Sequence, residues 1–244
     1  MRRTPLLLAA ASSASLLLAG CGAATSDTAR PAPQVAPAAA TEDAPALADG
    51  LLPADRFAPG GTVTQVTGDE FAGLLGRARG HDVDPGAVTV TPQACVDALT
   101  AARAALGDPS AVDDVAGQYT RTGFTGTAEV LTTGGPAATV VGTLTDAVAA
   151  CPTATVATPM GQAVVTFGTV TTPDLGDAAA VVPVTVSVTR DQGPGTTGSA
   201  LLGVVSDGDR VLGLATGGLG TAPDAAAFDA LLADAAQHAA DTLG

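Results

Sequence analysis

The second half of the chain alternates β-type segments with short turn-type gaps, and this pattern restricts the possible folds more than any other feature. Five segments rich in valine, threonine, alanine and leucine follow one another from residue 153 to residue 217. The gap at Asp207-Gly208-Asp209 contains the Asp-Gly pair that favours a tight hairpin. Because short gaps join antiparallel neighbours, we expect an antiparallel sheet. The segments are TATVATP, QAVVTFGTV, AAVVPVTVSVTR, TTGSALLGVVSD and RVLGLATG.

Helical and strand patterns precede residue 153. Thr67-Gly68-Asp69-Glu70 fits a capping box, and the apolar spacing that follows predicts a short amphipathic helix over residues 68–79. Residues 87–90 predict a brief strand, and residues 113–124 and 126–135 predict a hairpin. Residues 136–151 predict a helix that ends before Pro152. Between the strand and the hairpin, Pro92 suits the first position of another helix, whose inward face would carry Cys95, Leu99, Ala102 and Leu106.

A last helix begins after Pro223. Its apolar stripe consists of Phe228, Leu231, Leu232, Ala235 and Ala239. Strands that follow one another while the helices stay apart are typical of an α+β fold. We therefore predict a twisted antiparallel sheet with helices packed on one face, in a single domain of residues 51–244.

The amino terminus has the features of a secretory signal. Arg2 and Arg3 precede an apolar stretch from Leu6 to Leu18, which is shorter than the roughly 20 residues of a membrane-spanning helix. Leu18-Ala19-Gly20-Cys21 resembles the lipobox of bacterial lipoproteins, and this resemblance implies cleavage before Cys21 and acylation of that cysteine. We expect residues 1–20 to be a lipoprotein signal peptide and palmitate-type acylation to anchor the chain at the cell membrane. The alternative is an ordinary signal peptide with an unrelated cysteine.

Residues 21–50 are predicted to form a tether. After Cys21 they combine alanine, proline, threonine and acidic residues without an apolar period. The whole chain has a net charge of −14, and loss of Arg2 and Arg3 would bring it to −16. Such an acidic protein repels nucleic acid, so we expect no nucleic-acid partner. The absence of lysine and the abundance of alanine and glycine are typical of a high-GC genome, such as that of an actinobacterium.

Cys95 and Cys151 remain after Cys21. In a secreted domain, the default interpretation is a disulfide bond between them, which would close a loop of 57 residues. A reactive or metal-binding thiol would need a histidine partner, and the two histidines, His81 and His238, occur in unrelated contexts.

Three short motifs resemble parts of known binding sites. The glycine-rich stretch at 213–223 lacks the third small residue and the lysine of phosphate-binding loops, so a structural turn is the better interpretation. His81, Asp82 and Asp84 could bind a divalent metal, but their glycine and proline neighbours favour a surface loop. Calcium could similarly bind near an aspartate cluster, although its residues lack the EF-hand pattern: Asp108, Asp113 and Asp114.

No residue set indicates catalysis. The serines outside the first 50 residues lack a Gly-x-Ser-x-Gly elbow, and His238 lies between alanines on the last helix, where an exposed position is expected. The three glutamates are Glu42 in the tether, Glu70 in the capping box and Glu129, to which we assign no role. We therefore expect no catalytic residue, no metal and no cofactor, and we leave the ligand-binding residues unassigned.

The order of features resembles actinobacterial lipoproteins with the extracellular sensor domain of PknH-type serine/threonine kinases. The resemblance covers residues 51–244 and depends on the paired leucines at 51–52, TPQAC at 91–95, GQYTRTGF at 117–124 and the helix that ends at Cys151. It implies an α+β fold tied by disulfides, with a cleft that receives an unidentified ligand.

These observations favour a non-enzymatic, membrane-anchored domain outside the cytoplasm that senses or binds a small molecule, lipid or envelope component. An interaction or scaffolding module that binds another envelope protein is the first alternative. A large exposed apolar patch without a cavity would favour it. A hydrolase of envelope polymers is the third hypothesis and would require a cleft with paired carboxylates.

Overall fold

The computed structural model describes residues 46–66, 70, 88–106, 112–158, 161–190 and 194–244. They belong to a compact unit of residues 43–244. In chain order the elements are η1 (Leu47–Gly50), α1 (Ala54–Phe57), β1 (Val63–Val66), β2 (Thr89–Thr91), α3 (Gln93–Leu106), β3 (Val112–Thr122), β4 (Thr125–Gly134), α4 (Ala137–Ala150), β5 (Thr153–Thr158), β6 (Gly161–Phe167), β7 (Ala178–Arg190), β8 (Thr196–Asp207), β9 (Arg210–Leu219) and α5 (Ala225–Leu243).

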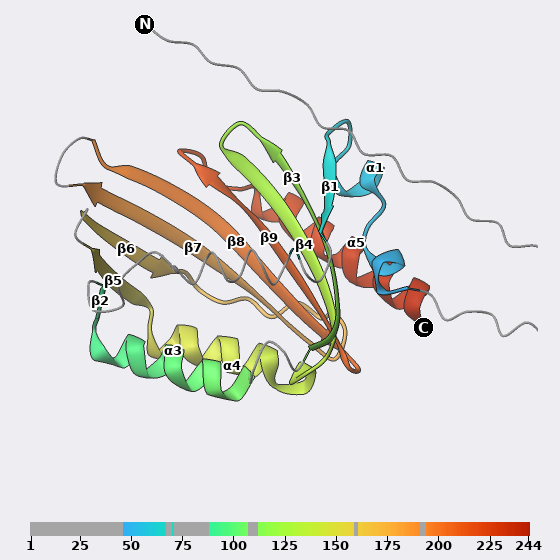
Figure 1. The fold of residues 1–244 in the computed structure, drawn as a ribbon, viewed down its shortest axis with the longest axis horizontal. Coiled ribbons are helices and arrows are strands. Elements are labelled where there is room, and N and C mark those ends of the chain that lie inside the picture. The colour runs from blue at the N-terminus through green and yellow to red at the C-terminus, as the bar shows by residue number, and fades with distance from the viewer. Residues whose placement is uncertain (1–45, 67–69, 71–87, 107–111, 159–160, 191–193) are drawn as a thin grey trace, which may run out of the picture. The chain divides into compact units, whose positions relative to one another are not determined.

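The described strands form one nine-stranded sheet in the order β1-β3-β4-β9-β8-β7-β6-β5-β2 (Figure 1). Every pairing in it is antiparallel. Among the described strands, β3 pairs with β4, and each strand from β5 to β8 pairs with the next one in the chain. The Asp-Gly turn joins β8 to β9, with Gly208 at a φ of 61°. The edge strands β1 and β2 follow one another among the described strands and yet lie at opposite edges. The predicted helix over residues 68–79 lies outside the described residues, except for Glu70.

Helices cover both faces of this sheet. A Cβ atom on Gly203 of β8 would lie 2.8 Å from Leu232 and 3.2 Å from Phe228, so Gly203 faces α5. Its strand neighbours Leu202 and Val204 face the opposite way, because successive residues of a strand alternate between faces. Their partners on β7 are Val182 and Ala180, which are fully buried, and α4 packs against these two strands.

The main core lies between the sheet and the layer formed by η1, α1 and α5. Asp224 begins α5 by accepting a hydrogen bond from the backbone N–H of Ala227 at 3.1 Å, as expected of an N-cap residue. Aliphatic side chains fill this core, together with two phenylalanines. Its buried members are Leu47, Leu51, Leu52, Phe57, Ala116, Leu131, Ala179, Val181, Leu201, Val205, Leu212, Leu214, Phe228, Leu232, Ala235 and Ala239.

A smaller cluster lies on the opposite face, under α3 and α4, which lie side by side (Figure 1). The predicted disulfide is present: Cys95 of α3 is bonded to Cys151, which ends α4. Both cysteines are buried and pack with Ala154 of β5. The disulfide therefore connects the beginning of one helix to the end of the other, as the sequence predicts.

The α+β class and the antiparallel pairing of the strands in the second half are confirmed. Three details differ. Helices lie on both faces rather than one, because the buried run Ala179–Val182 in β7 is covered from both sides. Leu99 of α3 is 54% exposed instead of facing inward. Ordered structure also begins before Leu51, since η1 buries Leu47 and Gly50.

Candidate functional site

A groove of about 550 Å³ lies on the face of the sheet that α3 and α4 share, over strands β1, β3, β4, β9 and β8. Its volume is within the range of about 300–1,000 Å³ found for small-molecule pockets. Because α4 packs against β7 and β8, the helices cover one half of this face and the groove occupies the other. Alternate residues of the five strands project into it: Val66, Gly117, Tyr119, Arg121, Gly126, Ala128, Val130, Ala200, Ala215 and Gly217.

The floor of the groove is made of unusually small side chains. Ala128 of β4 lies directly opposite Ala215 of β9, and the neighbouring positions Gly126 and Gly217 also pair. A Cβ atom on Gly217 would lie 2.7 Å from the Cβ atom of Ala200, so glycine is required there. The groove therefore exists because β4, β9 and β8 carry only glycine and alanine at its centre on this face.

The two ends of the groove differ in polarity. At one end, a Cβ atom on Gly117 would contact the side chains of Val130 and Val66, so this end is aliphatic. At the other end, next to the β3–β4 turn, the lining residues are Tyr119, Arg121 and Phe124. Tyr119 is 42% exposed and Phe124 is 73% exposed.

A buried polar cluster lies behind the groove, on the opposite face of the same two strands. Gln118 of β3 donates a hydrogen bond from Nε2 to Glu129 Oε2 of β4 at 2.6 Å and another to the backbone oxygen of Leu52 at 2.7 Å. The backbone N–H of Leu52 donates to the Glu129 carboxyl group at 3.2 and 3.3 Å. Gln65 of β1 in turn donates to Gln118 at 3.1 Å. These bonds attach the segment between η1 and α1 to the sheet.

Glu129 is fully buried, and this burial raises the pKa of its carboxyl group. The hydrogen bonds from Gln118 and Leu52 and the charge of His238 oppose the shift, but burial is the largest cause. The carboxyl group of Glu129 already accepts hydrogen bonds from Leu52 and Gln118 and lies behind the groove. We therefore assign this cluster a role in stabilising the fold rather than in binding a substrate.

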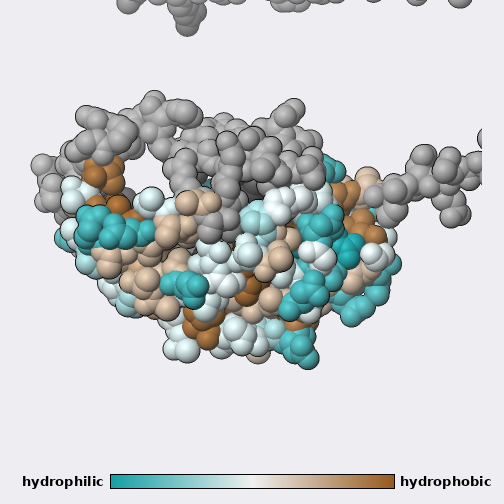
Figure 2. Space-filling view, turned by 90° about the horizontal axis from the view of Figure 1, so that it is seen from below, coloured by the Kyte–Doolittle hydropathy of each residue, from teal (hydrophilic) through white to brown (hydrophobic). Residues whose placement is uncertain are grey.

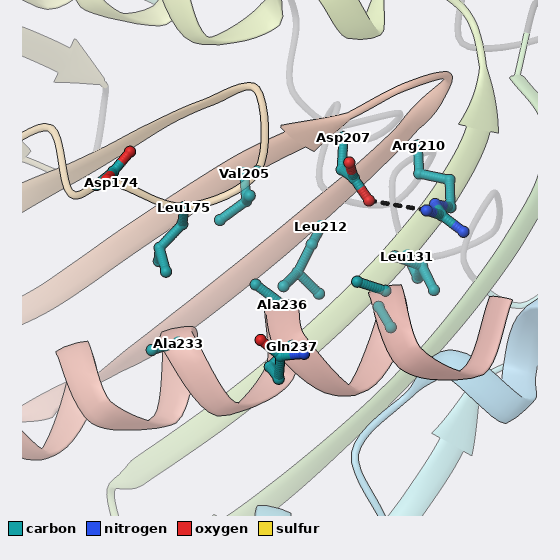
Figure 3. Close-up of a pocket in the computed structure, with 13 residues that line it drawn as sticks. Leu131, Asp174, Leu175, Val205, Asp207, Arg210, Leu212, Ala233, Ala236 and Gln237 are labelled. Atoms are coloured by element: carbon teal, nitrogen blue, oxygen red, sulfur yellow. Dashed lines mark hydrogen bonds and ion pairs between the residues drawn. The ribbon is translucent and has the colours of Figure 1, made fainter. Parts of the chain in front are cut away.

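A second, smaller cavity of about 200 Å³ lies between α5, the β8–β9 hairpin and the loop before β7 (Figure 3). Leucine, valine and alanine side chains form most of its wall. At one end, Arg210 forms an ion pair with Asp207 at 2.7 Å. Gly176 brings the loop close, because it adopts a φ of 54° and any Cβ there would lie 2.4 Å from the backbone oxygen of Ser206. Since Arg210, the basic residue in its wall, is already paired with Asp207, this cavity is a weaker candidate than the groove.

The structure places few of the residues that the motif comparison considered. His81, Asp82, Asp84 and Asp108 lie outside the described residues. Asp114 accepts a hydrogen bond from the backbone N–H of Val115 at 2.8 Å. In the described part of the chain, no three histidine, cysteine or acidic side chains come close enough to hold a metal ion.

Two expectations about single residues change. Most of the glycine-rich stretch, Gly213–Leu219, belongs to β9 rather than to a loop. His238, expected to be exposed, is half-buried on α5 near Glu129.

The sequence analysis missed both the groove and the role of Glu129. The sequence of β4 shows in part where the groove lies, because its larger and smaller residues alternate. One face of the strand is directed to the core, and the other carries small residues: Thr127, Glu129 and Leu131 on the first, Gly126, Ala128 and Val130 on the second. A run of small residues on one face indicates a groove only once the neighbouring strands are known.

No protein-family model and no curated protein matches the chain. Among solved structures, it is similar to the crystal structure of the extracellular domain of PknH from Mycobacterium tuberculosis. The identity is 13%, the TM-score is 0.42, and the alignment covers 80% of this chain and 92% of that one. A likeness at this level does not establish a shared function.

Proposed function

We propose that the protein is a non-enzymatic, lipid-anchored binding protein on the outer face of the cytoplasmic membrane, and that the sheet groove holds an apolar ligand there. The signal sequence and Cys21 support this proposal, because they indicate export and acylation. In the described part of the chain, no helix is long and apolar enough to span a membrane.

The groove is the observation that carries the proposal. Its volume of about 550 Å³ is available because strands at the centre of a sheet carry glycine and alanine on one face where valine, isoleucine or threonine are the usual residues. The lining is mostly apolar, with a few polar groups gathered at one end, which is the usual composition of a small-molecule site.

An interaction module would instead need a continuous apolar surface. On the side where α3 and α4 lie, Figure 2 shows apolar residues in small separate patches among polar ones. The visible described surface on that side therefore does not favour the protein-binding alternative.

Native mass spectrometry tests the proposal. The chain would be secreted from an actinobacterial host with an ordinary signal peptide in place of residues 1–20 and with Cys21→Ala, so that no detergent is needed for purification. A stoichiometric bound lipid or metabolite is the expected result. A mass equal to that of the protein alone, together with no binding of any apolar probe, would contradict the proposal.

A further inference from the structure

We infer that the ligand of the groove is a single-chain amphiphile with an anionic head, bound with its tail on the glycine and alanine floor and its head at Arg121. This inference rests on the proposed function and specifies the class of ligand. It starts from the polarity of the groove along the strand direction.

The residues that face the groove change in character along β3. Gly117, Tyr119 and Arg121 are successive positions on this face, and a strand rises about 3.3 Å per residue. Arg121 therefore lies about 13 Å along the strand from Gly117. The aliphatic end and the cationic end are thus separated by a distance suited to an extended chain, rather than to a compact molecule.

The charges of the residues that face the groove indicate that the head group of the ligand is anionic. The protein is acidic, with 24 acidic against 10 basic residues, yet in the part of the chain that the structure describes, no acidic side chain faces the groove. Glu129 contributes only its backbone, because its carboxyl group points to Leu52 on the other face. Among the described residues that line the groove, Arg121 is the one whose charged side chain faces it, and its guanidinium can bind a carboxylate or a phosphate.

Arg121 also retains donors for a ligand. Its Nε atom donates to the backbone oxygen of Gly123 at 3.1 Å, which holds the side chain against the turn and leaves the terminal nitrogens without a partner among the described residues. Tyr119 and Phe124 line the groove together with Arg121. The hairpin end thus offers a cation, a hydroxyl group and an aromatic surface next to the apolar floor.

Displacement of a neutral fluorescent probe, N-phenyl-1-naphthylamine, tests the inference with three competitors of equal chain length: tetradecanoate, tetradecanol and tetradecyltrimethylammonium. We expect tetradecanoate to displace the probe at a concentration about two- to five-fold lower than tetradecanol, as suits an exposed ion pair. The ammonium compound should compete least. Added salt should reduce the difference between the acid and the alcohol.

Arg121→Gln should abolish the preference for the acid while binding of the neutral probe persists. Arg56→Gln is the matched control, because Arg56 of α1 forms its ion pair with Asp234 of α5 on the opposite face of the sheet. Equal displacement by acid and alcohol in the unmodified protein, or a preference for the ammonium compound, would overturn the anionic head and leave the proposed function intact. Failure of the neutral probe to bind the unmodified protein would overturn both the anionic head and the proposed function.

Discussion

Glu129 and Gln118 lie directly opposite one another on β4 and β3, and their side chains together hold both backbone polar groups of Leu52. The hydrogen bond between the two side chains measures 2.6 Å. A carboxyl group and an amide are thus buried at the point where the segment that follows the predicted tether joins the sheet. The same two residues contribute their backbones to the groove on the other face.

Replacement of Glu129 tests the importance of this junction. Glu129→Ala would leave the buried N–H of Leu52 without an acceptor and create a cavity, so we expect a loss of about 2–4 kcal/mol in the free energy of unfolding. Glu129→Gln should cost less, because one amide oxygen can still accept a hydrogen bond. Urea unfolding followed by circular dichroism measures both. Equal stability of Glu129→Ala and the unmodified protein would show that the cluster is unimportant.

The raised pKa of Glu129 also predicts a pH dependence. In the folded protein this carboxyl group binds its proton more tightly than in the unfolded chain, so folding is favoured while the group is protonated. Its contribution to stability should therefore be lost as the pH rises from the ordinary glutamate pKa through the raised folded value. Glu129→Gln removes this titration. The stability of the unmodified protein relative to Glu129→Gln should fall over that pH range, and a difference independent of pH would refute the expectation.

The disulfide between Cys95 and Cys151 closes a loop of 57 residues. Its removal should cost about 4 kcal/mol, mainly because the reduced unfolded chain gains conformational freedom. The double variant Cys95→Ser and Cys151→Ser should unfold at a correspondingly lower urea concentration. An unchanged midpoint in the double variant would contradict this estimate.

Two glycines should respond to alanine in opposite ways. Gly142 is an exposed position in the interior of α4 with open space around it, so Gly142→Ala should stabilise the protein by about 0.5–1 kcal/mol. Gly203→Ala would bring a methyl group 2.8 Å from Leu232 and should destabilise by about 1–3 kcal/mol. Thermal unfolding of the two variants side by side checks the contrast. A melting temperature shifted in the same direction by both would disagree with the packing described for α5.

The proposed anchor depends on Cys21 alone. Cys21→Ser should move the protein from the membrane fraction to the culture medium, because the acyl chains would have no attachment site. Cell fractionation followed by immunoblotting measures this, and Cys95→Ser provides a control that removes a cysteine without affecting the signal. Retention of Cys21→Ser in the membrane would refute lipid anchoring.

The sequence predicts local structure here better than it predicts the site. Turn chemistry at Asp207–Asp209 and the period of α5 are local signals, and both elements form as expected. The placement of β1 and β2 at opposite edges results from pairings between residues far apart in the chain, such as Val63 with Thr120 and Thr89 with Ala157. No local pattern specifies such pairings.

The groove likewise results from pairings between residues that are far apart in the chain. Ala128, Ala215 and Ala200 come from three strands, and each alone has the appearance of an ordinary small residue. They form the floor of the groove only because the pairing of β4, β9 and β8 places them next to one another on the same face of the sheet. Glu129 was similarly unassigned, since its partner Leu52 lies 77 positions away in the chain.

Filling the groove tests the central claim most directly. Ala128→Leu would place a large side chain on the floor of the groove. Thr127→Val is the control, because Thr127 faces the other side of the sheet, where its hydroxyl group forms a hydrogen bond of 3.0 Å with that of Thr216. Native mass spectrometry would compare the liganded fraction of both variants with that of the unmodified protein. The account predicts a bound ligand in the unmodified protein and in Thr127→Val, and its loss in a folded Ala128→Leu. Equal ligand occupancy in Ala128→Leu would show that the ligand binds elsewhere.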